Sequence, residues 1–270
     1  MTGRIAVVFD SAGTLLHMYR VAKEATTGRI LENIESTSIV AKKNGCGLVV
    51  LNVENELILN TRKEMLLSEF LREYRVPLGV SCSRGEFFTQ KAREIIEGTK
   101  LRVGDVHDVL QAVSTHCPDI FYLAAGLIID SEAKNVPYVL STGGQTFNTT
   151  LKTVQTLRAL KVDIYIASGD SMLALQRLSE YIGVPHERVF ALATTRIKAQ
   201  VVLKLKQKYE NVLMVGDGIN DILAFKAADL GILTVQQGDK RPEKLRKAAD
   251  IVLDDIIKVV DVVKELKSRE

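Results

Sequence analysis

The sequence contains no tryptophan, and aromatic residues make up only 6% of its 270 positions. It therefore has few of the planar side chains on which single-stranded nucleic acids stack. The basic residues are scattered and the net charge is only +3, so no nucleic-acid partner is expected. The three cysteines are widely spaced and odd in number, and we expect them to be free thiols in a reducing compartment.

Long hydrophobic runs are absent as well. The longest covers residues 120–129, whereas a membrane-spanning helix needs about 20 apolar residues. The first residues lead straight into an expected strand and lack the charged and apolar regions of a secretory signal. We therefore expect a cytoplasmic protein with no membrane partner, and the sequence leaves homo-oligomer formation open.

The overall composition is typical of a globular protein, with 46% hydrophobic and 26% charged residues. In the carboxyl-terminal half, apolar segments of strand and helix character alternate. Strands are expected at residues 162–167, 189–191, 211–215 and 230–233, and helices at 149–160, 172–182, 198–209 and up to 228. This alternation predicts an α/β fold with a parallel sheet and right-handed crossovers.

The stretch from residue 17 to residue 146 has a different pattern. Helices are expected at residues 27–43, 64–74, 85–97 and 104–115, and strands at 48–53, 120–129 and 138–140. The stretch is long enough for a small core of its own. We therefore expect a catalytic core formed by residues 1–16 and 147–270, with residues 17–146 inserted as a second α/β domain.

The first expected strand ends on an acid, Asp10, which is followed by a loop that contains glycine. A sheet holds such a carboxylate still, and the backbone N–H groups of the turn can bind an anion. Asp10 is therefore a candidate nucleophile. Two positions later, where a second carboxylate would be expected, the residue is Ala12.

Two other expected strands also end on polar residues, Ser168 and Asp217. In parallel sheets, ligands bind outside the carboxyl ends of the strands, so these groups are expected to converge with Asp10. Two neighbouring carboxylates are costly unless a cation binds between them, and Mg²⁺ is the natural one. Asp221 suits either a direct or an indirect role in that site, and Lys198 offers a positive charge. Together these groups are typical of phosphoryl transfer.

These motifs resemble those of the haloacid dehalogenase superfamily. The matching segments are residues 10–15, residues 166–170, Lys198 and residues 216–221, in that order. Residues 147–260 are also similar to the phosphorylation domain of P-type ATPases, including the tail at residues 249–253. The resemblance implies a Rossmann-like core with an inserted cap domain that reads the substrate.

The resemblance also implies roles for individual residues. Asp10 and Lys198 are the expected catalytic groups. Phosphate is expected to bind at Ser11, Ser168, Gly169 and Lys198. The expected magnesium ligands are Asp10, the backbone carbonyl of Ala12, Asp217 and Asp221. Arg196 lies close enough in the sequence to be the alternative to Lys198.

Ala12 leaves three hypotheses open, because the superfamily's phosphatases carry an aspartate there for acid–base catalysis. The first is a Mg²⁺-dependent phosphatase or phosphotransferase that acts on a small phosphorylated molecule through an aspartyl phosphate and turns over slowly. The second is cleavage of a C–P bond by an enzyme similar to phosphonoacetaldehyde hydrolase, with Lys23, Lys42 or Lys63 as the Schiff-base lysine. The third is a non-catalytic protein that binds phosphate.

Overall fold

The computed structural model of the protein describes residues 4–117, 120–170, 172–238 and 241–268. The chain forms two compact units. The first consists of Met1–Met18 with Gly144–Glu270, and the second of Tyr19–Gly143. The chain passes between them through the strands β2 (Leu16–Glu24) and β7 (Asn135–Thr146), each of which contains one of the two boundaries.

The first unit is built on a six-stranded sheet with the strand order β12-β11-β10-β1-β8-β9. Every neighbouring pair in this sheet is parallel. Its strands are β1 (Ile5–Phe9), β8 (Asp163–Ala167), β9 (Val189–Phe190), β10 (Asn211–Gly216), β11 (Leu230–Thr234) and β12 (Ile251–Leu253). The α/β class with a parallel sheet that the sequence predicts is confirmed.

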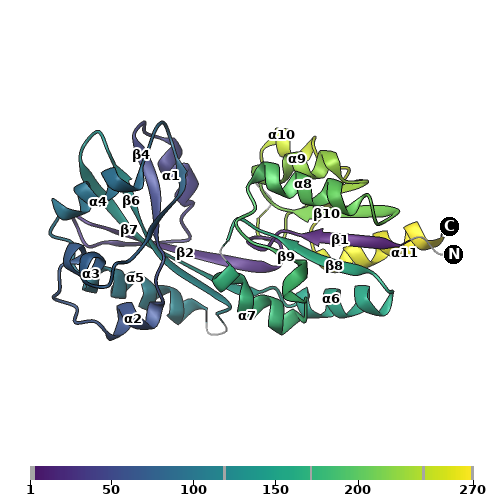
Figure 1. Cartoon of the computed structure of the whole chain (residues 1–270), viewed down its shortest axis with the longest axis horizontal. Helices are drawn as coiled ribbons and strands as arrows, with labels where there is room; N and C mark the ends of the chain where they lie inside the picture. Colours follow the sequence, from purple (N-terminus) through teal and green to yellow (C-terminus); the bar gives the residue numbers. More distant parts are fainter. Residues whose placement is uncertain (1–3, 118–119, 171, 239–240, 269–270) are drawn as a thin grey trace. The chain divides into compact units, whose positions relative to one another are not determined.

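The central strand β1 carries the sequence Ile-Ala-Val-Val-Phe, and all five residues are buried. A strand that is apolar at every position suits a parallel sheet, because helices cover both of its faces. Helices α8 (Thr195–Leu205), α9 (Ile222–Ala227) and α10 (Glu243–Arg246) lie on one face (Figure 1). Helices α6 (Thr150–Ala159), α7 (Met172–Ile182) and α11 (Val259–Ser268) lie on the other (Figure 1). Short 3-10 helices are present at His186–Arg188 (η1), Ile219–Asp221 (η2) and Ile256–Lys258 (η3).

The second unit has its own six-stranded sheet, with the strand order β3-β2-β7-β6-β4-β5. Beside β2 and β7 it contains β3 (Ile30–Glu32), β4 (Cys46–Leu51), β5 (Leu78–Ser83) and β6 (Tyr122–Asp130). Strand β4 pairs antiparallel with both β5 and β6, and β2 pairs antiparallel with β3. This sheet therefore contains antiparallel pairs, whereas the sheet of the first unit is parallel throughout.

The helices of the second unit are α1 (Ser36–Ala41), α2 (Asn55–Asn60), α3 (Leu67–Glu73), α4 (Thr89–Glu97) and α5 (Val103–His116). Its main core gathers apolar side chains of α2–α5 against the sheet, with Phe70 and Leu127 fully buried. A smaller cluster includes Val40 of α1 and Ile128 of β6. Because both clusters lie within Tyr19–Gly143, this unit has a hydrophobic core of its own.

The expected helix at residues 27–43 is wrong. Gly28 has a φ of +71°, and its N–H donates to the carbonyl of Glu24, which closes a tight turn. The chain then returns as β3 in antiparallel register with β2, and only the later part becomes α1. The patterns in the sequence also do not predict α2 or β5. Cross-strand pairing in the second sheet outweighs the helical spacing of the apolar residues there.

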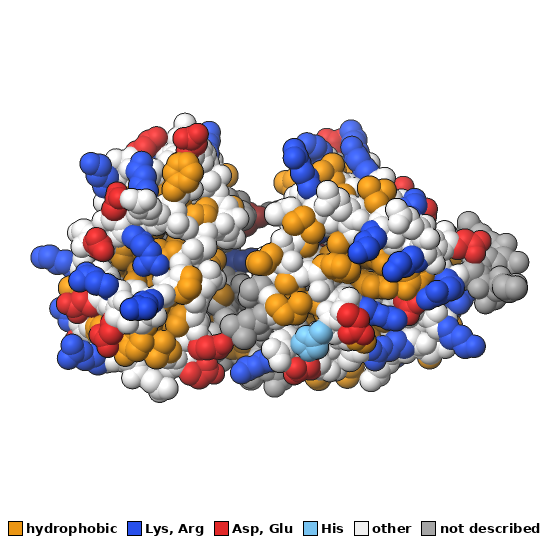
Figure 2. Space-filling view, viewed as in Figure 1, with side chains coloured by type: hydrophobic (Ala, Val, Ile, Leu, Met, Phe, Trp, Pro, Cys, Tyr) orange, Lys and Arg blue, Asp and Glu red, His pale blue; other side chains and the backbone are white. Residues whose placement is uncertain are grey.

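No helix in the described part of the chain combines the length and apolar character needed to cross a lipid bilayer. Figure 2 shows Lys, Arg, Asp and Glu side chains interspersed over the visible surface of each unit. On that face, neither sign of charge forms a continuous patch.

Candidate active site

Asp10 lies directly after the central strand, at the carboxyl edge of the parallel sheet. Its N–H donates to the carbonyl of Val215 over 2.9 Å, which extends the pairing of β1 with β10 by one residue. The residue is only 4% exposed. The sheet on both sides of β1 therefore fixes the position of its carboxylate.

The loop after Asp10 depends on Gly13. This residue has a φ of +76°, and a Cβ added to it would lie 2.0 Å from Oδ2 of Asp217. Only glycine meets both the backbone and the steric requirement. The loop can therefore lie directly against the Asp217 carboxylate, although 204 positions of sequence separate the two residues (217 − 13).

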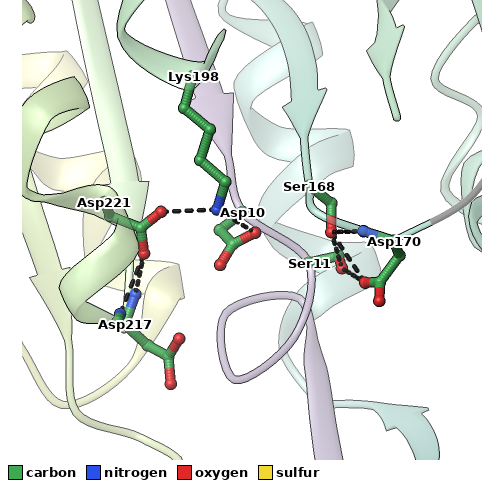
Figure 3. Close-up of polar contacts among 8 residues, drawn as sticks. Asp10, Ser11, Ser168, Asp170, Lys198, Asp217 and Asp221 are labelled. Atoms are coloured by element: carbon green, nitrogen blue, oxygen red, sulfur yellow. Dashed lines mark hydrogen bonds and ion pairs between the residues drawn. The ribbon is translucent and has the colours of Figure 1, made fainter. Parts of the chain in front are cut away.

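Lys198 lies in the first turn of α8, where Thr194 caps the helix by accepting the N–H of Ile197. Its side chain is fully buried, and Nζ lies 2.8 Å from Oδ1 of Asp10 and 2.7 Å from Oδ1 of Asp221. Figure 3 shows Lys198 reaching between these two carboxylates. Arg196, the alternative to Lys198, is exposed.

The ammonium group of Lys198 stays charged in this environment. Burial alone would lower the pKa of Lys198, but the negative charges of Asp10 and Asp221 and their hydrogen bonds raise it above its ordinary value. The side chain is therefore a fixed positive charge between two acids.

Asp221 is fully buried and has a structural role in addition to its contact with Lys198. Its Oδ2 accepts the backbone N–H groups of Asp217, at 3.2 Å, and Gly218, at 3.0 Å. A Cβ on Gly216 would come within 2.4 Å of the same oxygen, so this position also requires glycine. Asp221 thus holds the turn after β10 closed and ties it to Lys198.

Ser168 follows strand β8 and is buried beside Ser11. The two hydroxyl oxygens lie 2.9 Å apart, and both lie close to Oδ2 of Asp170, at 2.7 Å from Ser11 and 2.8 Å from Ser168. Figure 3 shows this group on the side of Asp10 opposite Asp221. A Cβ on Gly169 would meet no heavy atom within 4 Å, so the backbone there borders open space. The backbone of this stretch can donate to an anion, whereas the two hydroxyls donate to Asp170 and would have to turn toward an anion to bind it.

Three carboxylates of this edge come close together. Asp10, Asp217 and Asp221 each offer an oxygen within 4.8 Å of the others. The pKa of Asp10 is raised well above its ordinary value, first by burial and then by the charge of Asp221, although Lys198 opposes this and Asp217 adds to it. The surplus of negative charge and the all-oxygen donor set fit a hard divalent cation such as Mg²⁺.

Two participants in the site were not assigned a role from the sequence. Asp170 belongs to the matching segment at residues 166–170, but its contact with Ser11 depends on β1 and β8 being neighbours. Arg241 lies in the loop after β11, and its Nη2 donates to Oδ2 of Asp217 over 2.7 Å. No spacing or local pattern in the sequence marks Arg241.

The fold and the site together define a Rossmann-like α/β protein with an acidic site at the carboxyl edge of its parallel sheet. The model of the haloacid dehalogenase-like hydrolases matches residues 6–229. The chain belongs to this family, as the motifs in the sequence predict.

Several curated proteins and solved structures are similar to the chain. A "Soluble P-type ATPase-like phosphatase" from Methanocaldococcus jannaschii is 32% identical over 268 residues, which is 99% of this chain and 96% of that protein. A "Probable copper-transporting ATPase PacS" from Synechocystis is 42% identical over 79 residues, 29% of this chain and 10% of that protein. The crystal structure of a zinc-transporting PIB-type ATPase in its E2.Pi state covers 99% of this chain and 42% of that chain, with a TM-score of 0.50 and 18% identity. The last similarity concerns the fold alone.

Proposed function

We propose that the protein is a Mg²⁺-dependent phosphatase that acts on a small phosphorylated molecule, with Asp10 as the nucleophile. One observation carries the proposal. The buried Lys198 bridges Asp10 and Asp221 at the carboxyl edge of the sheet, with Asp217 near enough to complete an acidic site. The relative from Methanocaldococcus jannaschii, which bears the name phosphatase and matches nearly the whole chain, supports the same class of reaction.

Asp10 begins the reaction when one of its carboxylate oxygens attacks phosphorus. The bond from phosphorus to the leaving-group oxygen breaks, and that oxygen takes a proton from water, because the methyl group of Ala12 has none to give. Water then attacks the phosphorus of the aspartyl phosphate. The bond from phosphorus to Asp10 breaks, and inorganic phosphate and a proton are released. An alcohol in place of water gives a phosphotransferase by the same route.

The residues around Asp10 divide the remaining tasks. Ser168, Ser11 and the backbone at Gly169 orient the phosphoryl oxygens, and Lys198 offsets their charge. Asp10, Asp217 and Asp221 are the groups that would hold Mg²⁺, and the family resemblance adds the carbonyl of Ala12. Bound there, the ion would lower the charge repulsion between the phosphoryl group and the aspartates.

Because Ala12 cannot activate water, the release of phosphate from Asp10 should be slow. Acid–base assistance is worth about 10²–10⁴-fold in rate, and a methyl group supplies none. With a leaving group that needs no protonation, such as that of p-nitrophenyl phosphate, we therefore expect the aspartyl phosphate to form and then to break down slowly.

Of the three candidate Schiff-base lysines, Lys23 does not suit the cleavage of a C–P bond, while Lys42 and Lys63 are exposed. Lys23 donates to Asp105 at 2.8 Å and to Asp108 at 2.6 Å. Although burial lowers the pKa of Lys23, the hydrogen bonds to these two acids raise it overall, so the amine is held in its charged form. A Schiff-base lysine must instead be neutral when it attacks.

The test combines substrate hydrolysis with trapping of the intermediate. The full chain is assayed with Mg²⁺ against p-nitrophenyl phosphate and a panel of sugar, nucleoside and amino-acid phosphates. We expect Mg²⁺-dependent phosphate release that Asp10→Asn abolishes, together with a phosphoprotein that hydroxylamine cleaves. Asp254→Asn, which removes an exposed acid beside Lys258, is the matched control and should retain activity. Binding of beryllofluoride without any turnover would favour a non-catalytic phosphate-binding protein instead.

A further inference from the structure

The acidic site has two basic partners that differ in how firmly they are held. Lys198 is fully buried and contacts two carboxylates, Asp10 and Asp221. Arg241 contacts the third carboxylate, Asp217, and its side chain remains 18% exposed. Three acids and two bases leave one negative charge in excess (−3 + 2 = −1).

The contact between Arg241 and Asp217 is not the strongest that these two groups can form. An arginine pairs best with a carboxylate through two parallel N–H bonds. Here Nη2 donates to Oδ2 over 2.7 Å, while the buried Nε–H has no acceptor among the described residues. A buried donor without an acceptor is unfavourable, so Arg241 is the more easily displaced of the two bases.

Gln236 and Gln237, a few residues before Arg241 in the sequence, contact the chain that follows Asp10. Gln236 donates through Nε2 to the carbonyl of Thr14 in the loop after Asp10. The side-chain amide of Gln237 accepts the N–H of Met18 at 2.8 Å and donates to its carbonyl at 3.0 Å. Gln236 and Gln237, which precede Arg241 in the sequence, are thus bound to the chain that follows the nucleophile.

We propose that Arg241 is an exchangeable counter-ion, which neutralises Asp217 when the site holds no metal and is displaced from it when a divalent cation binds. Arg241 then sets the affinity of the site for the cation and keeps Asp217 in place before the cation arrives. The proposal rests on the cation site of the proposed function. It adds a residue to that site outside the four matching motifs.

Calorimetric titration of the metal-free full chain with Mg²⁺ tests the exchange. In Arg241→Ala no charged group has to leave Asp217, so Mg²⁺ should bind at least about tenfold more tightly. This is a small part of the roughly 10³-fold that a unit charge about 4 Å away is worth at an effective dielectric constant near 20. Arg241→Gln should behave in the same way and replaces the alanine variant if that one fails to fold. Arg241→Lys keeps the charge and should retain an affinity close to that of the wild type. Lys247→Ala removes an exposed charge paired with Glu243 and should leave the affinity unchanged.

Urea unfolding without metal gives a second readout. Arg241→Ala should lower the midpoint of unfolding, and this effect should disappear in the Asp217→Asn background, because the partner charge is already gone. Mg²⁺ affinity in Arg241→Ala that is unchanged or weaker than in the wild type would overturn the exchange. Such a result for Arg241→Ala leaves the proposed function intact, provided that the wild type binds Mg²⁺ and needs it for turnover. A wild-type chain that binds no Mg²⁺ overturns both the cation site and the exchange.

Discussion

Lys198 and Asp10 form a buried ion pair, with 2.8 Å between Nζ and Oδ1 and side-chain exposures of 0% and 6%. Lys198 comes from the start of α8 and Asp10 from the end of β1, so the pair joins a helix to the central strand. A second contact of Nζ, 2.7 Å from Asp221, adds the turn after β10. One side chain thus connects three segments of the site.

Lys198→Met should therefore destabilise the metal-free protein strongly. Removal of one partner leaves Asp10 and Asp221 buried without compensation, which typically costs about 3–5 kcal/mol. Urea unfolding followed by circular dichroism measures the loss. Lys247→Ala, which breaks an exposed pair, should change the free energy of unfolding by less than about 0.5 kcal/mol. Equal effects of the two substitutions would contradict the structural role of Lys198.

Gly13→Ala should damage both the fold and the cation site. The φ of +76° strains any other residue, and the new Cβ would lie 2.0 Å from Oδ2 of Asp217, so the loop or the carboxylate must shift. We expect a loss of at least about 1 kcal/mol in stability and weaker Mg²⁺ binding by calorimetry. Gly238→Ala is the control, because its Cβ would meet no heavy atom within 4 Å. If both variants bind Mg²⁺ as the wild type does, the close approach of Gly13 to Asp217 is not needed for the site.

Asp163 should make the stability of the first unit depend on pH. It accepts hydrogen bonds from Tyr209 at 2.8 Å and from Arg4 at 3.2 Å, and Arg188 lies 2.7 Å away. Burial raises the pKa of Asp163, but the hydrogen bonds of Tyr209 and Arg188 and the charge of Arg188 lower it overall. A carboxyl group whose pKa is lower in the folded state stabilises the protein above its ordinary pKa, and the stabilisation is lost as the pH falls through the folded value.

Asp163→Asn tests this dependence in urea unfolding at several pH values. The variant should be less stable than the wild type at neutral pH by about 2 kcal/mol. Below about pH 4, the ordinary range for aspartate, the two proteins should become more alike. Asp261→Asn, which alters an exposed acid beside Lys264, should follow the wild type throughout. A difference between Asp163→Asn and the wild type that does not shrink in acid would exclude this role for Asp163.

The sequence predicts those parts of the fold that local patterns determine. Helix α7 has the bounds that the sequence predicts. It ends at Ile182 because Gly183, with a φ of +70°, terminates it. The strands β1 and β10 can also be identified from the sequence, because buried parallel strands are continuous hydrophobic runs. The sequence also suggests that Asp10 and Asp217 lie together, because both follow strands of one parallel sheet.

The other features of the fold and the site depend on contacts between residues that are far apart in the sequence. The apolar residues at 27–43 have helical spacing, but the turn at Gly28 and the pairing of β3 with β2 produce a hairpin in the first part of this stretch. The contact of Asp170 with Ser11 exists only because β8 lies beside β1. Arg241 lies 24 residues after Asp217, beyond α9 and β11, so no local rule could have identified their contact.

Ala12→Asp tests where the proposed reaction is slow. If the aspartyl phosphate forms at Asp10 and merely lacks a group to activate water, a carboxylate at this position should raise turnover by about 10²–10⁴-fold. The lifetime of the trapped phosphoprotein should shorten in proportion, which rapid-quench measurements can follow. Ala12→Asn is the matched control, because it has nearly the same size but does not take up a proton, and it should stay slow. Equal rates in the two variants would show that the release of phosphate from Asp10 is not limited by a missing acid–base group.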